Sequence, residues 1–396
     1  MDALLKSFQE CSDYQLVVVT TASIPQTVRV EEKGITYYAL SGGVPMLYDE
    51  NSKENRRIWS QLLQEEKPSL IQVWGTEFTH GLCALRCAKS IPSVIYMQGY
   101  LWSIARYYYA GISHGELFKN ITLRDVLKRD SIIQQRKKYA RSSMKEKEML
   151  QLSGRIITEN EWCERSIRMF FPNIINYKCP LNINEVFGQA EWQIEEAEKH
   201  TIVCTASGYP LKGLHMVLRA IAVLKNEYPD IKLYVPGPKM VSDGSIEWCL
   251  RKRGYTKYIE GLIKELGLSD SIIWLGSIPQ QELAQVYEKA RVFVLSSAIE
   301  NHSSSLKEAM MVGTPCVASK VGGVPEYVMH NEDAMLYRFE EYEVMASYVK
   351  QIFNDDALAL KLSQNGKKKM LELHKPNYIF KRIQSIYNDI IDGEKE

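Results

Sequence analysis

The chain has 396 residues, of which 45% are hydrophobic and 24% charged, and its formal net charge is +1. This length favours two domains, and the near-zero charge gives no support to nucleic-acid binding. The eight cysteines include no C-x2-C pair, which argues against a zinc site or a disulfide framework and favours a reducing compartment. No run approaches 18 apolar residues and the N-terminal MDALLKSFQE has no apolar signal core, so we expect a cytoplasmic protein.

Short β-branched runs alternate with helical patterns along the chain. In the first half we predict strands at residues 15–21, 35–40, 70–74, 93–97, 155–158 and 174–177. In the second half we predict strands at residues 202–205, 232–235, 271–275, 292–295 and 316–318. Helical periodicity marks residues 78–88, 213–228 and 377–391. This alternation predicts an α/β fold with doubly wound parallel sheets covered by helices on both faces.

Residues 181–200 carry no strand pattern, and the acidic run 191–199 is the predicted linker. We therefore predict an N-terminal domain at 1–185, a second domain at 186–376 and a C-terminal helix at 377–396 that packs back on the N-terminal domain. Ligands of doubly wound sheets bind outside the carboxyl ends of the strands. The expected ligand site is therefore a cleft between two such sheets.

The most informative segment reads SSAIENHSSSLKEAMMVGTPCVAS. A polar loop at 297–305 leads into a helix predicted at 306–312, which Gly313 ends. The N-terminus of a helix that follows a strand offers unpaired N–H groups to a phosphate. Glu300 and Glu308 lie in the same segment, and their carboxylates would repel a phosphate but suit sugar and ribose hydroxyls.

Simpler interpretations of these residues remain open. Ser305 followed three residues later by Glu308 also fits a capping box, which stabilises many helices without any ligand. Lys212 precedes a predicted helix, where a solvated lysine is the ordinary interpretation although its charge is locally unfavourable. A bound anion would explain why a cation is tolerated there.

The motif E-x7-E stands here as ENHSSSLKE, from Glu300 to Glu308, and is followed by EAMMVGTPCVAS and GGVPE. SGYPLKGLHMVLRAI, LYVPGP and WLGSIPQQELAQVY precede it in that order. Together these motifs resemble the family-4 retaining glycosyltransferases over most of residues 201–338, and VWGTEFTHGL, YMQGY and ITENEW resemble them more loosely. The resemblance implies the GT-B fold, two facing Rossmann-like domains with an inter-domain cleft. It also implies a nucleotide-diphosphate sugar as substrate, retention of anomeric configuration, and no metal or other cofactor.

The resemblance also assigns roles to residues. Glu308 would accept hydrogen bonds from the ribose, Glu300 would contact the donor sugar, and Lys212 would neutralise the diphosphate as the leaving group departs; we expect Glu300 and Lys212 to be catalytic. The full expected donor site comprises Gly208, Lys212, Gly237, Glu300, Asn301, His302, Ser303, Ser304, Ser305, Leu306 and Glu308. On the acceptor side the candidates are His80, Gln98 and Glu159, for which a structural role is the competing interpretation.

Two further expectations concern the N-terminal half. Relative to the family pattern, one strand and one glycine-rich loop are missing before MDALLKSFQE, which leaves the activity of this chain open. Residues 124–147 hold nine basic and three acidic residues, close to Trp102 and Tyr107-Tyr108-Tyr109. This composition suits anionic lipid headgroups, although a solvated helix face explains it equally well.

The sequence thus predicts a retaining hexosyltransferase that builds bacterial cell-surface polysaccharide, such as capsule or lipopolysaccharide. Its expected partners are a nucleotide sugar, a saccharide or lipid-linked acceptor and, as an open alternative to a free cytoplasmic location, the anionic inner face of the membrane. A nucleotide-sugar epimerase and a non-catalytic nucleotide-sugar-binding protein remain as alternatives.

Overall fold

The computed structural model describes residues 2–9, 11, 14–88, 90–206, 208–242 and 244–393. The chain divides into two compact units. Unit 1 consists of Met1–Leu101, Ala140–Asn182 and His374–Glu396, and unit 2 of Trp102–Tyr139 and Ile183–Leu373. Among the described residues, no helix combines the length and apolar character needed to cross a bilayer.

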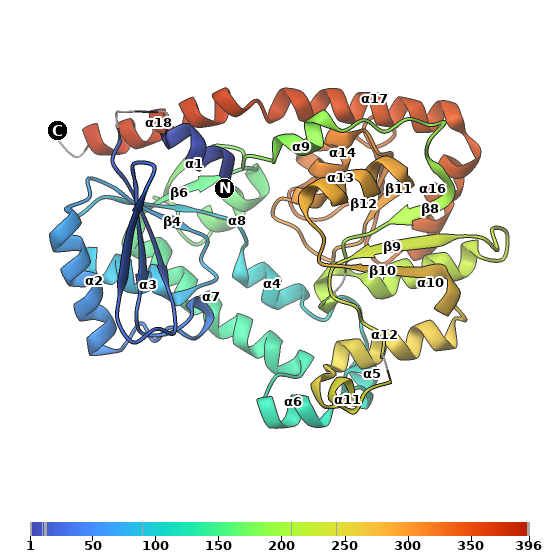
Figure 1. Cartoon of the computed structure of the whole chain (residues 1–396), viewed down its shortest axis with the longest axis horizontal. Helices are drawn as coiled ribbons and strands as arrows, with labels where there is room; N and C mark the ends of the chain where they lie inside the picture. Colours follow the sequence, from blue (N-terminus) through green and yellow to red (C-terminus); the bar gives the residue numbers. More distant parts are fainter. Residues whose placement is uncertain are drawn as a thin grey trace. The chain divides into compact units, whose positions relative to one another are not determined.

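Unit 1 contains sheets with the strand orders β1-β3-β2 and β4-β5-β6-β7. The strands β4 and β6 of the second sheet are labelled in Figure 1. Its strands are β1 (Leu16–Thr21), β2 (Val28–Glu32), β3 (Ile35–Leu40), β4 (Ile71–Trp74), β5 (Ser93–Tyr96), β6 (Arg155–Thr158) and β7 (Ile175–Lys178). Its helices are α1 (Asp2–Gln9), η1 (Pro45–Leu47), α2 (Lys53–Glu66), α3 (Thr79–Ala88), α8 (Glu161–Arg168) and α18 (Pro376–Asp392). The isoleucines of α18, among them Ile379 and Ile383, pack with Val94 of β5 and Ile157 of β6 in one hydrophobic cluster.

The strand β2 is absent from the sequence-based prediction and is antiparallel to β3. All of its residues are exposed, and Arg29, Glu31 and Glu32 interrupt its apolar pattern, as is common in edge strands. The turn before β3 places Lys33 and Gly34 at φ of 50° and 77°, which is typical of a two-residue hairpin. The expectation of wholly parallel sheets is therefore wrong for this edge.

Unit 2 is built on a parallel sheet with the strand order β10-β9-β8-β11-β12-β13. Its strands are β8 (Glu198–Val203), β9 (Lys232–Pro236), β10 (Ile272–Gly276), β11 (Ala290–Leu295), β12 (Cys316–Ser319) and β13 (Met335–Tyr337). The helices up to α11 are α4 (Leu101–Tyr107), α5 (His114–Lys119), α6 (Leu123–Lys128), α9 (Glu185–Gln189), η2 (Pro210–Lys212), α10 (Leu214–Leu224) and α11 (Ile246–Arg251). The later helices are α12 (Gly254–Glu265), η3 (Ser269–Ser271), α13 (Gln280–Lys289), α14 (Ser304–Val312), α15 (Val324–Tyr327), α16 (Tyr342–Asn354) and α17 (Asp356–Leu373).

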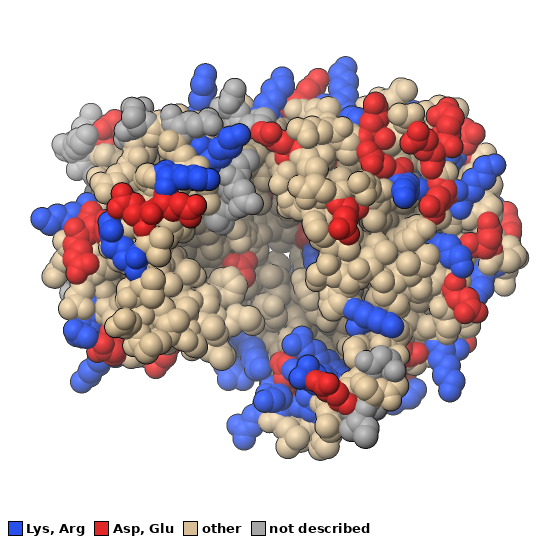
Figure 2. Space-filling model, viewed as in Figure 1, with Lys and Arg blue, Asp and Glu red and all other residues tan. Residues whose placement is uncertain are grey.

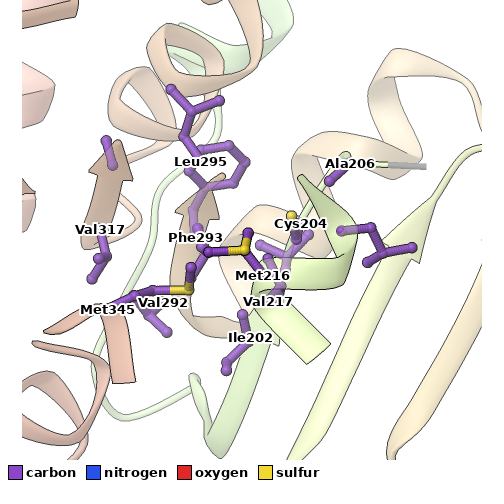
Figure 3. Close-up of a cluster of buried hydrophobic side chains, with 14 of the residues drawn as sticks. Ile202, Cys204, Ala206, Met216, Val217, Val292, Phe293, Leu295, Val317 and Met345 are labelled. Atoms are coloured by element: carbon purple, nitrogen blue, oxygen red, sulfur yellow. The ribbon is translucent and has the colours of Figure 1, made fainter. Parts of the chain in front are cut away.

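The core of unit 2 lies around the central strands β8 and β11. Ile202 of β8 and Phe293 of β11 are buried together with Val217 of α10 (Figure 3). Because hydrophobic side chains fill this region, the two strands are held in a fixed register, with Val203 opposite Phe293. The loops that follow β8 and β11 therefore start from neighbouring, rigid strand ends.

One boundary and one strand of unit 2 differ from the sequence-based prediction. The segment 181–200, predicted to carry no strand, contains α9 and the start of β8. The pairing of β8 with β11 continues back to Glu198 through a register shift. His200, within this part of β8, adopts a φ of 53°. The short strand β13 was not predicted, because three residues give too little pattern.

The segment Trp102–Tyr139 belongs to unit 2, whereas the sequence-based division keeps it with the N-terminal residues. His215 Nε2 lies 2.8 Å from the Ala110 carbonyl oxygen, and the Gly254 N–H donates to Asp125 over 2.8 Å. Burial lowers the pKa of His215 to about 4, so the imidazole stays neutral near pH 7. The boundary between the units falls inside α7 (Ile132–Ser153).

Candidate functional site

The carboxyl ends of β8 and β11 lie side by side where the strand order of unit 2 reverses. Lys212 follows β8 and Glu300 follows β11. The Lys212 Nζ donates to Glu300 Oε1 over 2.7 Å, and the Ser297 hydroxyl donates to the same oxygen over 2.6 Å. The Glu300 side chain is only 10% exposed. Since ligands of doubly wound sheets bind at such a switch point, this pair is the centre of the candidate site.

Lys212 directly precedes Gly213, the N-cap of α10, where the helix dipole disfavours a cation. Burial lowers the pKa of Lys212, but the Glu300 carboxylate and the Tyr209 hydroxyl outweigh it, so that the pKa lies above its ordinary value. Lys212 therefore remains charged near pH 7. The anion that makes this cation tolerable is a side chain of the protein itself, whereas the sequence suggested a bound ligand.

Two glycines bring the backbone of this region together. Gly213 has a φ of 70°, and a Cβ there would lie 1.7 Å from the Ser296 carbonyl oxygen. Gly322 has a φ of 50°, and a Cβ there would lie 1.8 Å from the Glu300 carbonyl oxygen, which accepts a hydrogen bond from the Gly323 N–H over 3.1 Å. The GGVPE segment thus supports the backbone of Glu300.

The helix α14 begins at Ser304, two residues earlier than predicted. Its N-cap is Ser303, whose hydroxyl accepts a hydrogen bond from the Leu306 N–H over 3.3 Å. The predicted capping box of Ser305 and Glu308 is therefore wrong, because the first of three consecutive serines takes the cap and Glu308 falls in the second turn. The N–H groups of the first turn lie at the carboxyl edge of the sheet, in the same segment as Glu300.

Glu308 lies in a largely apolar environment. Burial raises the pKa of its carboxyl group to about 7, and the nearby Tyr287 hydroxyl partly offsets this effect. That hydroxyl is buried and makes no direct hydrogen bond within the part of the chain that the structure describes. Hydrogen bonds donated to a carboxylate favour its ionised form, so a donor group placed beside Glu308 would lower the pKa of its carboxyl group.

Lys307 is a residue of this site that the sequence analysis did not single out. Its side chain is 1% exposed, its Nζ contacts His302 Nε2, and it lies 5.3 Å from the centre of the Tyr327 ring. The His302 ring stacks on Tyr327 with a centroid separation of 5.1 Å. A protonated Lys307 that donates to Nε2 places the imidazole proton on Nδ1. The available signal was a lysine inside the apolar face of the helix LKEAMMV.

The predicted glycines Gly208 and Gly237 also lie at carboxyl ends of unit 2 strands. Their φ values are 108° and 111°, a region that glycine adopts without the strain of a side chain. The Gly208 N–H points at the Met240 sulfur over 3.2 Å, and the Gly237 N–H donates to the Gly276 carbonyl over 2.7 Å. Both therefore shape the strand ends, and their contact with a donor remains a prediction.

The acceptor-side candidates lie in unit 1. His80 is in the first turn of α3, where burial lowers its pKa; its Nδ1 is buried without a hydrogen-bond partner among the residues described. Gln98 follows β5 and is exposed. Glu159 follows β6, and its Oε2 accepts a hydrogen bond from the Leu181 N–H over 2.8 Å, which fixes the chain after β7. Glu159 thus has a structural contact, whereas His80 and Gln98 remain candidates.

Glu77, which directly follows β4 and Gly75-Thr76, is a second residue that the sequence analysis did not single out. Burial raises the pKa of its carboxyl group, against the effect of nearby backbone N–H groups that include that of Gly99. A Cβ on Gly75 would lie 2.1 Å from Glu77 Oε2 and 3.4 Å from Gln98 Oε1, so these two side chains converge at the ends of β4 and β5. Buried acids with raised pKa values are enriched at functional sites.

The sequence of this chain is similar to those of known glycosyltransferases. Residues 189–369 match the model of the family described as glycosyl transferases group 1. N-acetyl-alpha-D-glucosaminyl L-malate synthase of Bacillus anthracis is 26% identical over 52% of this chain and 49% of that protein. D-inositol 3-phosphate glycosyltransferase of Corynebacterium urealyticum is 32% identical over 37% of this chain and 33% of that protein. The matches thus span about half of these relatives or less.

Solved structures resemble nearly the whole chain. Sucrose-phosphate synthase from Thermosynechococcus elongatus superimposes with a TM-score of 0.72 at 18% identity, over 99% of this chain and 91% of that one. Anabaena HepE in complex with UDP and glucose gives 0.65 at 14% identity, over 98% and 96%. At such identities the likeness concerns the fold, which is GT-B, as predicted. The match to the glycosyl transferases group 1 model, over residues 189–369, includes the Lys212–Glu300 pair and α14.

Proposed function

We propose that the protein is a family-4 retaining glycosyltransferase that moves a hexosyl group from a nucleotide-diphosphate sugar to a saccharide or lipid-linked acceptor. The observation that carries this proposal is the charged Lys212, held 2.7 Å from Glu300 at the switch point of the sheet, in the segment that matches the family. We place the activity in cell-surface polysaccharide synthesis, such as capsule or lipopolysaccharide, at the cytoplasmic face of the membrane.

Each group has a chemical task in this proposal. Negative charge grows on the diphosphate as the sugar bond breaks, and Lys212 together with the N-terminus of α14 stabilises it. Glu300, fixed by Ser297, accepts hydrogen bonds from the donor sugar, and Glu308 accepts those of the ribose. The acceptor attacks on the face that the leaving group vacates, and the departing phosphate assists its deprotonation. Such contacts accelerate the reaction only as far as they strengthen in the transition state.

The related structure of HepE, which contains UDP and glucose, supports a nucleotide-sugar donor. Thermal-shift screening against a panel of nucleotide sugars identifies the donor, because a ligand that binds only the folded state stabilises it. A hydrolysis assay with that donor then separates the alternatives. A transferase releases sugar slowly without acceptor, an epimerase returns an isomerised donor, and a binding protein leaves the donor intact.

Glu308→Ala is expected to weaken binding of the nucleoside diphosphate about ten- to a hundredfold, because one or two charge-assisted hydrogen bonds worth about 1.5–3 kcal/mol are lost. Calorimetric titration measures the affinity directly. Because the pKa of Glu308 lies at about 7 and ribose donors favour the carboxylate, wild-type affinity should rise between about pH 6 and pH 8.

Glu308→Gln is the matched control, because it keeps the shape of the side chain and cannot ionise. Its affinity should show no step between these two pH values. Unchanged affinity in Glu308→Ala, with only a loss of stability, would leave Glu308 a purely structural residue.

Activity is expected to survive an excess of chelator, because we assign the diphosphate to Lys212 and a helix N-terminus rather than to a metal ion. Turnover of the identified donor with and without EDTA measures this. Loss of activity in EDTA that manganese restores would show that a divalent cation carries the diphosphate chemistry.

A further inference from the structure

The short helices α5, α6 and α11 of unit 2 lie together (Figure 1), and each exposes large apolar side chains. These residues are Phe118, Leu123, Val126, Leu127 and Leu250, which are between 60% and 73% exposed; we call them the apolar lobe surface. The segments are joined by direct bonds, since Thr122 Oγ1 donates to the Lys252 carbonyl over 2.9 Å and Lys257 Nζ donates to the Lys119 carbonyl over 3.0 Å. The apolar side chains thus stand on one connected scaffold.

The helix α6 is turned with its apolar face outward. Leu123, Val126 and Leu127 have the i, i+3, i+4 spacing that places side chains on one helix face, and all three are exposed. Asp125, on the opposite face, is 1% exposed and accepts a hydrogen bond from the Gly254 N–H. Burying the acid and exposing the leucines is the reverse of an ordinary surface helix, so the leucines indicate a partner.

The charge around this surface favours an anionic partner. Residues 114–130 and 246–257 hold eight basic and four acidic residues, a net charge of +4. The acids are already engaged: Glu116 with Lys119, Asp125 and Asp130 with Arg124, and Glu247 with Arg251. For Lys128, Arg129 and Arg253 no ion pair is found among the described residues. Figure 2 shows Lys and Arg gathered along this lobe, whose tip is mainly uncharged.

This surface shares only residues 124–130 with the basic stretch 124–147 singled out from the sequence, whose role at a membrane remains a prediction. The Arg136 guanidinium donates to the Ala105 carbonyl and lies over the Tyr109 ring, and Lys138 pairs with Asp130. Tyr108, expected beside the basic residues, is 2% exposed. Within the described part of this stretch, Lys128, Arg129, Lys137 and Arg141 form no ion pair, and Lys128 and Arg129 directly follow Leu127 of α6.

We propose that the apolar lobe surface docks on an anionic phospholipid bilayer, with Leu123, Leu127 and Phe118 entering the interface and Lys128, Arg129 and Arg253 contacting lipid phosphates. Apolar side chains bordered by basic ones suit the headgroup region of a bilayer. The apolar groups enter the boundary with the acyl chains there, and the basic groups contact anionic headgroups. This inference deepens the proposed function. The role of the surface in presenting a lipid-linked acceptor rests on that proposed function. The docking itself depends only on the apolar lobe surface and the basic residues beside it.

The test is co-sedimentation of the full chain with vesicles of phosphatidylglycerol and phosphatidylcholine, compared with phosphatidylcholine alone. Wild type should prefer the anionic vesicles at least about tenfold, and this preference should shrink at high salt. Leu123→Ser/Leu127→Ser and Lys128→Glu/Arg129→Glu should each weaken binding about tenfold or more. The controls Val223→Ser/Met329→Ser and Lys289→Glu/Lys368→Glu change exposed residues elsewhere in unit 2 and should bind as wild type does.

Three results would overturn the proposal. These are equal binding to both kinds of vesicle, equal losses in the control variants, and a loss that depends on the charges but not on the leucines. A concentration-dependent dimer that Leu123→Ser/Leu127→Ser dissociates in sedimentation velocity would also overturn it and assign the surface to a second copy of the chain. Titration with nucleoside diphosphate keeps the questions separate, because failure of wild type to bind it counts against the glycosyltransferase and not against docking.

Discussion

Gly322→Ala is expected to reduce donor turnover about a hundredfold without unfolding the protein. The new Cβ would lie 1.8 Å from the Glu300 carbonyl oxygen, so the backbone of Glu300 must move, and displacements of about 1 Å in a reacting geometry cost about 10²-fold in rate. The measurement is kcat/KM with the nucleotide sugar selected by thermal shift, together with the melting temperature of each variant.

Gly267→Ala is the matched control for this change. Gly267 is in the same unit and has a φ of 64°, but a Cβ there would meet nothing within 4 Å. It therefore carries the strain of a left-handed alanine, about 1–2 kcal/mol, without the collision. If both variants keep the same turnover, the contact between Gly322 and Glu300 has no part in the reaction.

Lys212→Met is expected to lower kcat about 10²- to 10³-fold, the loss typical of removing one donor that stabilises a developing anion. It should also destabilise the fold, because the largely buried Glu300 carboxylate loses its cation, at a cost of about 1–3 kcal/mol. Adding Glu300→Gln should recover much of that stability and none of the activity. Urea unfolding and turnover of the single and double variants measure the two effects.

The exposed ion pair of Lys350 and Glu227, at 2.6 Å, provides the comparison. Lys350→Met should change stability by less than about 1 kcal/mol and leave turnover unchanged. A Lys212→Met enzyme with wild-type turnover would restrict Lys212 to folding.

The sequence predicted most of the parallel strands of both units because each is a short β-branched run between helical patterns. The prediction failed for segments in which the alternation of apolar and polar residues does not indicate a strand. The strand β2 is charged and fully exposed, and the start of β8 depends on a register shift opposite β11. Assigning Trp102–Tyr139 to unit 2 depends on His215 and Asp125, whose partners lie about a hundred residues away in the chain.

At the site, the sequence around Glu300 and Glu308 was informative because it predicted a polar loop that leads into a helix. It could not show that Glu300 pairs with Lys212, 88 residues away, because such contacts depend on how the strands are ordered. The sequence also could not show that Ser303 rather than Ser305 is the N-cap. Three adjacent serines are chemically equivalent, and only the backbone conformation determines which of them caps the helix. Lys307 was missed although it lies among the apolar residues of LKEAMMV, because a lysine is ordinarily expected to be exposed.

The contact of Lys307 with His302 constrains the order in which these positions can change during evolution. If His302 is replaced first, the buried ammonium loses the acceptor at Nε2, and losing a hydrogen bond to a buried charged group is costly. If Lys307 first becomes an apolar residue, the imidazole stays stacked on Tyr327 and no longer faces a buried ammonium. Descendants of this protein should therefore lose Lys307 before His302, and an alignment of close relatives should contain histidine without lysine more often than lysine without histidine.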